Sequence, residues 1–267
     1  MAGPTTAQRG ARKAPGSSAA RPPREKGPGS RLRLPGRPWV ILLVVAALLL
    51  AGGGVWALYG STWLRVERVK SSGTQVLTPD EVLAAAAVPV GAPLISVDTD
   101  AIEDRLRRKL PRIDSVDVVR SWPHAIGLKV TERKAVLLVR KGAQFVEVDD
   151  ESVRFATVPK APKGVPLLEL TPDQSPSLRR FGADRLMREA VRVQGEIPES
   201  VAQDVRSFKV RSYDAISLKL SRGRTVDWGS SEQGEAKART LRALMKAAPK
   251  AAHFDVSAPT APAVSGS

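Results

Sequence analysis

One group of residues has the types and spacing that a catalytic or metal-binding site could use. It consists of the acids Asp98, Asp100, Glu103 and Asp104. Closely spaced carboxylates can act as general acid and base, or they can coordinate calcium. These acids stand at the expected start of a helix, where the helix dipole favours negative charge, and no glycine occupies the EF-hand position. We therefore interpret the group as a helix start rather than as a catalytic or metal site.

The chain contains few of the residues that bind metals or carry out redox chemistry. It has no cysteine, and its two histidines, His124 and His253, are far apart in the sequence. A metal would need carboxylates for at least half of its ligands, and thiol chemistry and disulfides are excluded. The sequence also lacks a G-x-S-x-G elbow, a Walker phosphate loop and an H-E-x-x-H helix. We expect a protein that is not an enzyme and that needs no cofactor or metal.

Residues 39–59 form an apolar segment without a charged side chain. As a helix it would be about 30 Å long, which matches the hydrocarbon core of a bilayer. Aromatic residues typical of the headgroup level mark both ends, namely Trp39 at one and Trp56, Tyr59 and Trp63 at the other. A core helix would usually be shorter or have a polar face, and the apolar region of a signal peptide spans only about 7 to 15 residues. We expect a transmembrane helix, with cleavage near residues 57–61 as the alternative.

The 267-residue chain has a formal net charge of +15, and much of it lies in residues 1–38, where Glu25 is the single acid. Positive flanks stay on the cytoplasmic side, so we expect a cytoplasmic N-terminus and an extracytoplasmic bulk. The segment is rich in Gly, Pro, Ala and Ser and is expected to be disordered. We interpret it as a tail that sets topology and lies against anionic headgroups; binding of nucleic acid is the alternative.

After the span, residues 63–132 predict a small α+β domain. The stretch 64–70 alternates apolar and charged residues, as a half-buried strand does. Thr78 and Pro79 start one helix, and a second helix starts near Asp98. The apolar residues of this second helix recur at every fourth position: Ile102, Leu106 and Leu110.

Two strands are expected next, within residues 113–130, joined by a turn at residues 121–124. The order strand, helix, helix, strand, strand places both helices on one face of a sheet. The basic residues in 105–112 would suit phosphate groups of lipid or wall polymers. A charged helix face opposite an apolar stripe is usually solvated, and we interpret it in that way.

A second domain, mainly of antiparallel strands, is expected over residues 135–257, so the fold class is α+β. Its first expected elements are successive antiparallel strands in 135–170, a polar loop at 171–183 and a short helix with Leu186, Ala190 and Val193. Strands at 205–210 and 216–220 follow, and the segment 217–229 is expected to form a hairpin that turns at residues 222 and 223. A C-terminal helix at 232–247 and a final strand at 253–257 complete the domain. Residues 258–267 are small and polar and are expected to form a disordered tail.

Several segments resemble the FtsQ/DivIB family of bacterial cell-division proteins, in its actinobacterial form. They are LRVERVKSSGT, TPDEVLAAAAVPVGAPLISVD and IDSVDVVRSWPHAIGLKVTERKAV in the first domain, and TVDWG and FDVSAPTAP near the end. The most specific piece is the turn with Arg120, Trp122 and Pro123, followed by a strand that ends in Glu132 and Arg133. Lys134 and Ala135 stand where the family usually has a proline, a small departure. By architecture the resemblance covers residues 35–262.

The resemblance implies a POTRA domain over residues 63–132, in which Arg120, Trp122 and Pro123 are structural, and an FtsQ-type β domain over 135–257. It further implies a non-enzymatic divisome scaffold that crosses the cell membrane once and is enriched at the septum. Such a scaffold binds FtsB/FtsL-like partners, and through them FtsW and FtsI-like septal synthases. It links early and late division proteins that control septal wall synthesis.

The family also implies where the partner binds. Its FtsB-like partner adds a strand beside the last helix and last strand, which correspond here to residues 232–247 and 253–257. The implied contact residues are His253, Phe254, Asp255, Val256 and Ser257, with Trp228 and Tyr213 as aromatic surface. Packing in the core is the alternative for these residues, above all for Val256, because alternate strand residues face the core.

Three other functions stay open as alternatives. One is a membrane-anchored chaperone or secretion component with a POTRA domain, although such proteins usually carry several POTRA copies or a long barrel. Another is a membrane-anchored wall hydrolase, for which no arrangement of carboxylates or nucleophile stands out. The third is an anchor that binds DNA or lipid through the basic tail.

Overall fold

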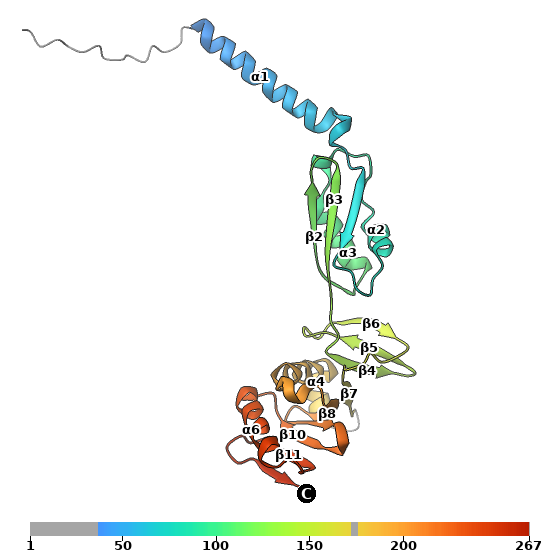
Figure 1. Cartoon of the computed structure of the whole chain (residues 1–267), viewed down its shortest axis with the longest axis vertical. Helices are drawn as coiled ribbons and strands as arrows, with labels where there is room; N and C mark the ends of the chain where they lie inside the picture. The colour runs from blue at the N-terminus through green and yellow to red at the C-terminus, as the bar shows by residue number, and fades with distance from the viewer. Residues whose placement is uncertain (1–36, 172–175, 267) are drawn as a thin grey trace, which may run out of the picture. The chain divides into compact units, whose positions relative to one another are not determined.

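The computed structural model describes residues 37–171 and 176–266, so the expected tail 1–38 lies almost wholly outside the described residues (Figure 1). Helix α1 spans Arg37–Gly60, contains the apolar segment 39–59 and has no buried residue. Within the described residues it is the one helix long and apolar enough to cross a membrane. The predicted membrane-spanning helix is therefore present as a helix.

The first domain has the predicted order strand, helix, helix, strand, strand. Its elements are β1 (Arg68–Ser72), α2 (Pro79–Ala86), the 3₁₀ turn η2 (Leu94–Ser96), α3 (Thr99–Lys109), β2 (Ile113–Ser121) and β3 (Ala125–Glu132). β3 lies in the middle of the sheet, parallel to β1 and antiparallel to β2. β1 begins four residues later than expected, and Leu64, the first residue of the expected strand, lies in the 3₁₀ turn η1 (Thr62–Leu64).

Side chains at the predicted helix starts form the expected caps. The Thr78 hydroxyl accepts from Glu81 N at 3.2 Å, and the Glu81 carboxylate accepts from Thr78 N at 2.8 Å. Asp98 accepts from Ala101 N at 3.0 Å and so starts α3. Both helices contribute to one core, with Val82 from α2 and Leu106 from α3 packed among the apolar residues of the strands.

The other acids near the start of α3 also have structural partners. Glu103 accepts from Val118 N at 2.9 Å, and Asp104 pairs with Arg107 at 2.6 Å. Among the residues that the structure describes, no group of three His, Cys, Asp or Glu is placed to hold a metal ion. The acids considered above as a possible catalytic or metal site thus stabilise the start of α3 and connect this helix to β2.

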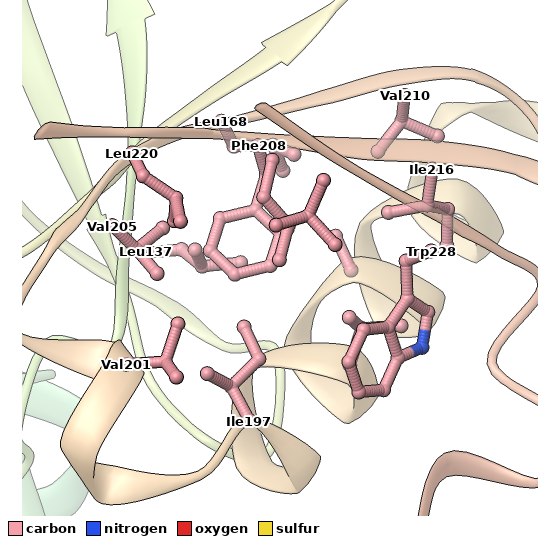
Figure 2. Close-up of a cluster of buried hydrophobic side chains, with 14 of the residues drawn as sticks. Leu137, Leu168, Ile197, Val201, Val205, Phe208, Val210, Ile216, Leu220 and Trp228 are labelled. Atoms are coloured by element: carbon pink, nitrogen blue, oxygen red, sulfur yellow. The ribbon is translucent and has the colours of Figure 1, made fainter. Parts of the chain in front are cut away.

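The second domain is built on one mixed sheet, which in the described residues has nine strands in the order β12-β11-β10-β9-β8-β7-β4-β5-β6. The strands are β4 (Leu137–Lys141), β5 (Gln144–Val148), β6 (Arg154–Val158), β7 (Leu167–Leu170), β8 (Val205–Ser212), β9 (Ala215–Leu220), β10 (Thr225–Gly229), β11 (His253–Asp255) and β12 (Ala263–Ser265). Phe208 and Trp228 point from the sheet toward Ile197 and Val201 and form the centre of its core (Figure 2).

Among the strands that the structure describes in this sheet, three pairs are parallel. β7 pairs parallel with both β4 and β8, and β10 pairs parallel with β11. The fold class is confirmed, but β7 does not continue the expected succession of antiparallel strands. Parallel neighbours need a crossover rather than a hairpin. The helices α4 (Pro176–Glu196) and α5 (Glu199–Ala202) make the crossover from β7 to β8, and α6 (Gly234–Ala247) makes the one from β10 to β11.

Two segments expected to be irregular carry regular structure. Much of the expected loop 171–183 belongs to α4, whose helical backbone is interrupted at Gly182 with a φ of 70°. Residues 172–175 of that loop lie outside the described residues. The expected disordered tail 258–267 instead contains β12, because Ala263–Ser265 pair antiparallel with β11.

The position of Gly73 directly after β1 gives a test of the first domain. Its φ is +87°, and an added Cβ would lie 2.1 Å from the Val130 carbonyl oxygen. Gly91 has the same φ of +87° with nothing within 4 Å of an added Cβ. The left-handed backbone alone costs an L-residue about 1–2 kcal/mol. We expect Gly91→Ala to lower the free energy of unfolding by about that amount, and Gly73→Ala by clearly more.

Urea unfolding of the two variants of the extracytoplasmic region measures this difference. Equal losses of stability in both variants would contradict the close approach of Gly73 to β3.

Candidate functional site

The C-terminal edge of the large sheet is formed by β12, not by β11. β11 lies between β10 and β12, with His253 opposite Ser265 and Asp255 opposite Ala263. The expected edge, His253–Asp255, is therefore covered on both sides. The prediction of an open edge at His253–Asp255 is wrong, because β12 lies in the segment that the sequence predicts to be a disordered tail.

Three of the expected contact residues belong to the core. Trp228, Phe254 and Val256 are each 0% exposed. Phe254 lies opposite Val226 of β10 and Val264 of β12, and it packs in the same hydrophobic cluster as Trp228. In this arrangement none of the three presents a surface to a partner, and the core alternative describes them.

The remaining residues of the segment 253–257 hold β11 and the turn after it. His253 Nδ1 lies 2.9 Å from the Thr225 hydroxyl on β10, and its Nε2 lies 3.6 Å from the Asp227 carboxylate. The Asp255 carboxylate accepts from the hydroxyl of Ser257 at 2.7 Å and from its N–H at 2.9 Å. The hydroxyl bond and the N–H bond lower the pKa of Asp255 below its ordinary value.

Tyr213 lies in the turn between β8 and β9. The Arg185 guanidinium lies over its ring at 5.7 Å from the centroid, and its hydroxyl is 3.5 Å from the Glu232 carboxylate. In the sheet order, β9 and β10 separate β8 from β11. Tyr213 therefore belongs to a different part of the sheet from the C-terminal edge.

A hollow of about 450 Å³ lies where β12 meets the end of α6. It is lined by Ala248, Pro249, Lys250, Ala251, Val264, Ser265 and Gly266. Val264 is 42% exposed, and Ala252 N donates to the Ser265 and Gly266 carbonyls at 3.2 and 2.7 Å. Sequence reasoning missed this site because Val264 is a single apolar residue among small ones, too weak a signal for a strand.

Polar contacts within the domain fix the start of α6. Lys237 is 2% exposed, and its ammonium donates to the Ser230 carbonyl at 2.8 Å. Burial lowers the pKa of Lys237 and raises the pKa of Glu196, which ends α4. A Cβ on Gly234 would lie 1.8 Å from a carboxylate oxygen of Glu196, so α6 starts in close contact with α4. The helix that borders the hollow is thereby held at its first turn.

Comparison with known proteins decides the family. The model of the POTRA domain, FtsQ-type, matches residues 64–133. Over the whole chain, the cell division protein FtsQ of Streptomyces coelicolor is 66% identical and is covered over 100% of its length. This chain belongs to the FtsQ family of cell division proteins.

Other FtsQ relatives agree with this. The FtsQ of Streptomyces venezuelae is 62% identical over 100% of this chain and 99% of the relative. The FtsQ of Mycobacteroides abscessus is 30% identical over 90% of this chain and 74% of the relative. The solved extracytoplasmic domain of the cell division protein DivIB from Geobacillus stearothermophilus aligns over 44% of this chain and 94% of its own, with 16% identity and a TM-score of 0.32, too low to carry an argument.

In this FtsQ-family chain, Arg120 of the POTRA turn holds the segment that leads into α3. Its Nε donates to the Leu94 carbonyl at 3.2 Å, and its Nη2 donates to the Val97 carbonyl at 2.6 Å. Pro123 is half-buried in the turn that joins β2 and β3. Trp122 in the same turn is 49% exposed, so its side chain does not behave as a core residue.

The Glu-Arg pair that follows this turn in the FtsQ family also has definite partners. Glu132 Oε1 accepts from Gln75 N at 2.6 Å and from Leu77 N at 3.0 Å, which satisfies the backbone of the loop before α2. Arg133 contacts the Asp149 carboxylate and pairs with Glu151 at 3.1 Å. Both side chains therefore hold neighbouring segments of the fold together.

The lowered pKa of Asp255 predicts how the turn after β11 responds to acid. Because the folded pKa lies below the ordinary value of 3.8, the stabilisation from this carboxylate is fully present above 3.8 and is lost as the pH falls through the folded pKa. We expect the Ser257 amide resonance to titrate with a midpoint below 3.8 in NMR spectra of the extracytoplasmic region.

Two variants separate the contributions. Ser257→Ala removes the hydroxyl donor and should raise the midpoint, whereas Asp255→Asn should abolish the titration. A midpoint at or above 3.8 in the unmodified chain would contradict the two hydrogen bonds.

Proposed function

We propose that this chain is a non-catalytic scaffold of the division machinery, and that it recruits partners through the β12 edge. The observation that carries the proposal is an edge strand with an apolar hollow beside it. An open edge presents unpaired N–H and C=O groups that a further strand can satisfy. The family membership supports the role in division, and the structural roles of the acids near α3 support the absence of catalysis.

The partners we propose are FtsB/FtsL-like single-pass division proteins, one of which adds a strand to β12. In such an addition the main-chain bonds supply affinity and flanking side chains supply selectivity. β12 has three residues, so it offers few main-chain bonds. Selectivity would then come from the hollow, whose Ala248, Ala251 and Val264 suit an apolar side chain of the partner.

The cellular arrangement follows from α1 and the charge of residues 1–38. The basic segment would stay in the cytoplasm and α1 would cross the membrane once. The two folded domains would then stand on the extracytoplasmic side, enriched at the septum. There the bound pair would connect this scaffold to FtsW and FtsI-like septal synthases, and so link early and late division proteins that control septal wall synthesis.

Val264→Asp tests the proposed edge. Val264 is 42% exposed, so the variant should fold, but a carboxylate beside the hollow would oppose an apolar side chain of the partner. We expect binding of the FtsB/FtsL-like pair to weaken about thirtyfold, which corresponds to a hot-spot loss of about 2 kcal/mol. Val153→Asp is the matched control, because Val153 is 39% exposed near β6 at the opposite end of the sheet order.

Isothermal titration with the purified partner pair gives the affinities, and circular dichroism checks the fold of each variant. Equal affinities for the chain, Val264→Asp and a folded chain that lacks residues 258–267 would exclude β12 as the binding edge. A fluorescent fusion that is spread evenly over the envelope would exclude the septal role.

A further inference from the structure

The end of the first domain that is nearest to α1 in the sequence is built from three segments. Val66 N donates to the Ala92 carbonyl, and Glu67 N donates to the His124 carbonyl, both at 2.9 Å. The parallel register of β1 and β3 then sets Arg68 opposite Ala125. The loop 89–92 and the turn 121–124 therefore lie beside the first residues of the domain, 63–70. We call these three segments the proximal tip.

The covalent chain keeps the proximal tip near the membrane surface. α1 has 24 residues and as a helix is about 36 Å long, so it extends beyond a hydrocarbon core of about 30 Å into the headgroup layer. Glu67 follows Gly60 by seven residues, a distance of at most about 25 Å even in a fully extended chain. Ala92 and His124, which are hydrogen-bonded to Val66 and Glu67, therefore also stay close to the membrane surface.

Large apolar side chains are exposed at the proximal tip. Trp63 is 70% exposed, Val90 is 66% exposed and Trp122 is 49% exposed. Outside α1, these two tryptophans are the exposed large aromatic side chains of the described residues. Tryptophan is enriched at membrane interfaces because its ring is apolar and its N–H is polar.

Cations accompany these side chains. Arg68 and Lys70 are exposed on β1, and within the described residues neither forms an ion pair with a carboxylate. Arg65 donates to the Gly91 carbonyl at 2.9 Å. Within residues 63–70 the three cations face one acid, Glu67, so the tip has a net positive charge. Positive charge near a bilayer surface attracts anionic lipids.

His124 lies beside Arg68. The Arg68 guanidinium contacts His124 Nε2. Nδ1 is buried and has no hydrogen-bond partner among the described residues. Both residues line a hollow of about 260 Å³ together with Lys70 and Trp122, which is room for a phosphate group.

We propose that the proximal tip is a binding surface for anionic phospholipid headgroups, with Arg68 and Lys70 on the phosphate and Trp63, Val90 and Trp122 among the headgroups and upper acyl chains. Arginine binds phosphate through two parallel N–H donors. The surface would hold the first domain against the membrane from which it extends, independently of any division partner. Of the proposed function, this inference requires only that α1 crosses the membrane, and it does not require partner binding at β12.

The absence of cysteine makes a direct test available in the full chain. Single cysteines at Ser121 and Val90 report on the tip, and one at Val76 is the control, since Val76 is 65% exposed beyond the opposite end of β1. Each carries a fluorophore, and the chain is placed in nanodiscs whose lipids carry a headgroup quencher. The lipids are phosphatidylcholine alone or phosphatidylcholine with phosphatidylglycerol.

We expect at least twofold stronger quenching at Ser121 and Val90 in the anionic nanodiscs than in the neutral ones, and no such difference at Val76. The double variant Arg68→Gln, Lys70→Gln should remove the difference without unfolding the domain, because both side chains are exposed. The proposal is overturned if quenching at Ser121 and Val90 does not depend on the lipid charge, or if the double variant keeps the full difference. The same scaffold protein encircles both kinds of nanodisc and no division partner is present, so a difference between the two lipid mixtures belongs to the lipid.

Discussion

Parallel strands cannot be joined by a tight turn, and the second domain is organised around that constraint. The chain leaves β7 through α4 and α5 before it returns as β8, and it leaves β10 through α6 before it returns as β11. Each crossover lays a helix on the sheet and so supplies the cover for a core that has no disulfide to support it. The C-terminal edge depends on the second crossover, because β12 can pair only after α6 has brought β11 alongside β10.

Local chemistry made part of this fold predictable. Thr78 with Glu81, and Asp98 before α3, are caps whose bonds form within three residues, so the sequence alone identifies them. The parallel pairing of β7 was not predictable, since periodicity shows that a segment is a strand but not which strand lies beside it. α4 was underestimated because Gly182 breaks its pattern.

The candidate site was harder to predict than the fold. Trp228 and Phe254 have the residue types of an interface, but the same types fill a core, and only the crossover of α6 decides between the two. β12 gave almost no signal, because Ala263–Ser265 gain their structure from β11 rather than from their own propensity. In the first domain the sequence identifies the turn with Arg120, Trp122 and Pro123 but does not separate the roles of its residues. Arg120 stabilises the fold through hydrogen bonds to the Leu94 and Val97 carbonyls, whereas the Trp122 side chain is exposed on the surface.

The shortness of β12 has a kinetic consequence. Each main-chain bond contributes a net of only about 0.5–1.5 kcal/mol, so a three-residue edge cannot hold a partner tightly through its backbone. Differences in affinity between related complexes appear mostly in the rate of dissociation. A partner strand that binds at this edge, as proposed above, would therefore dissociate rapidly unless side-chain contacts such as those in the hollow add affinity, and it could leave without unfolding this chain.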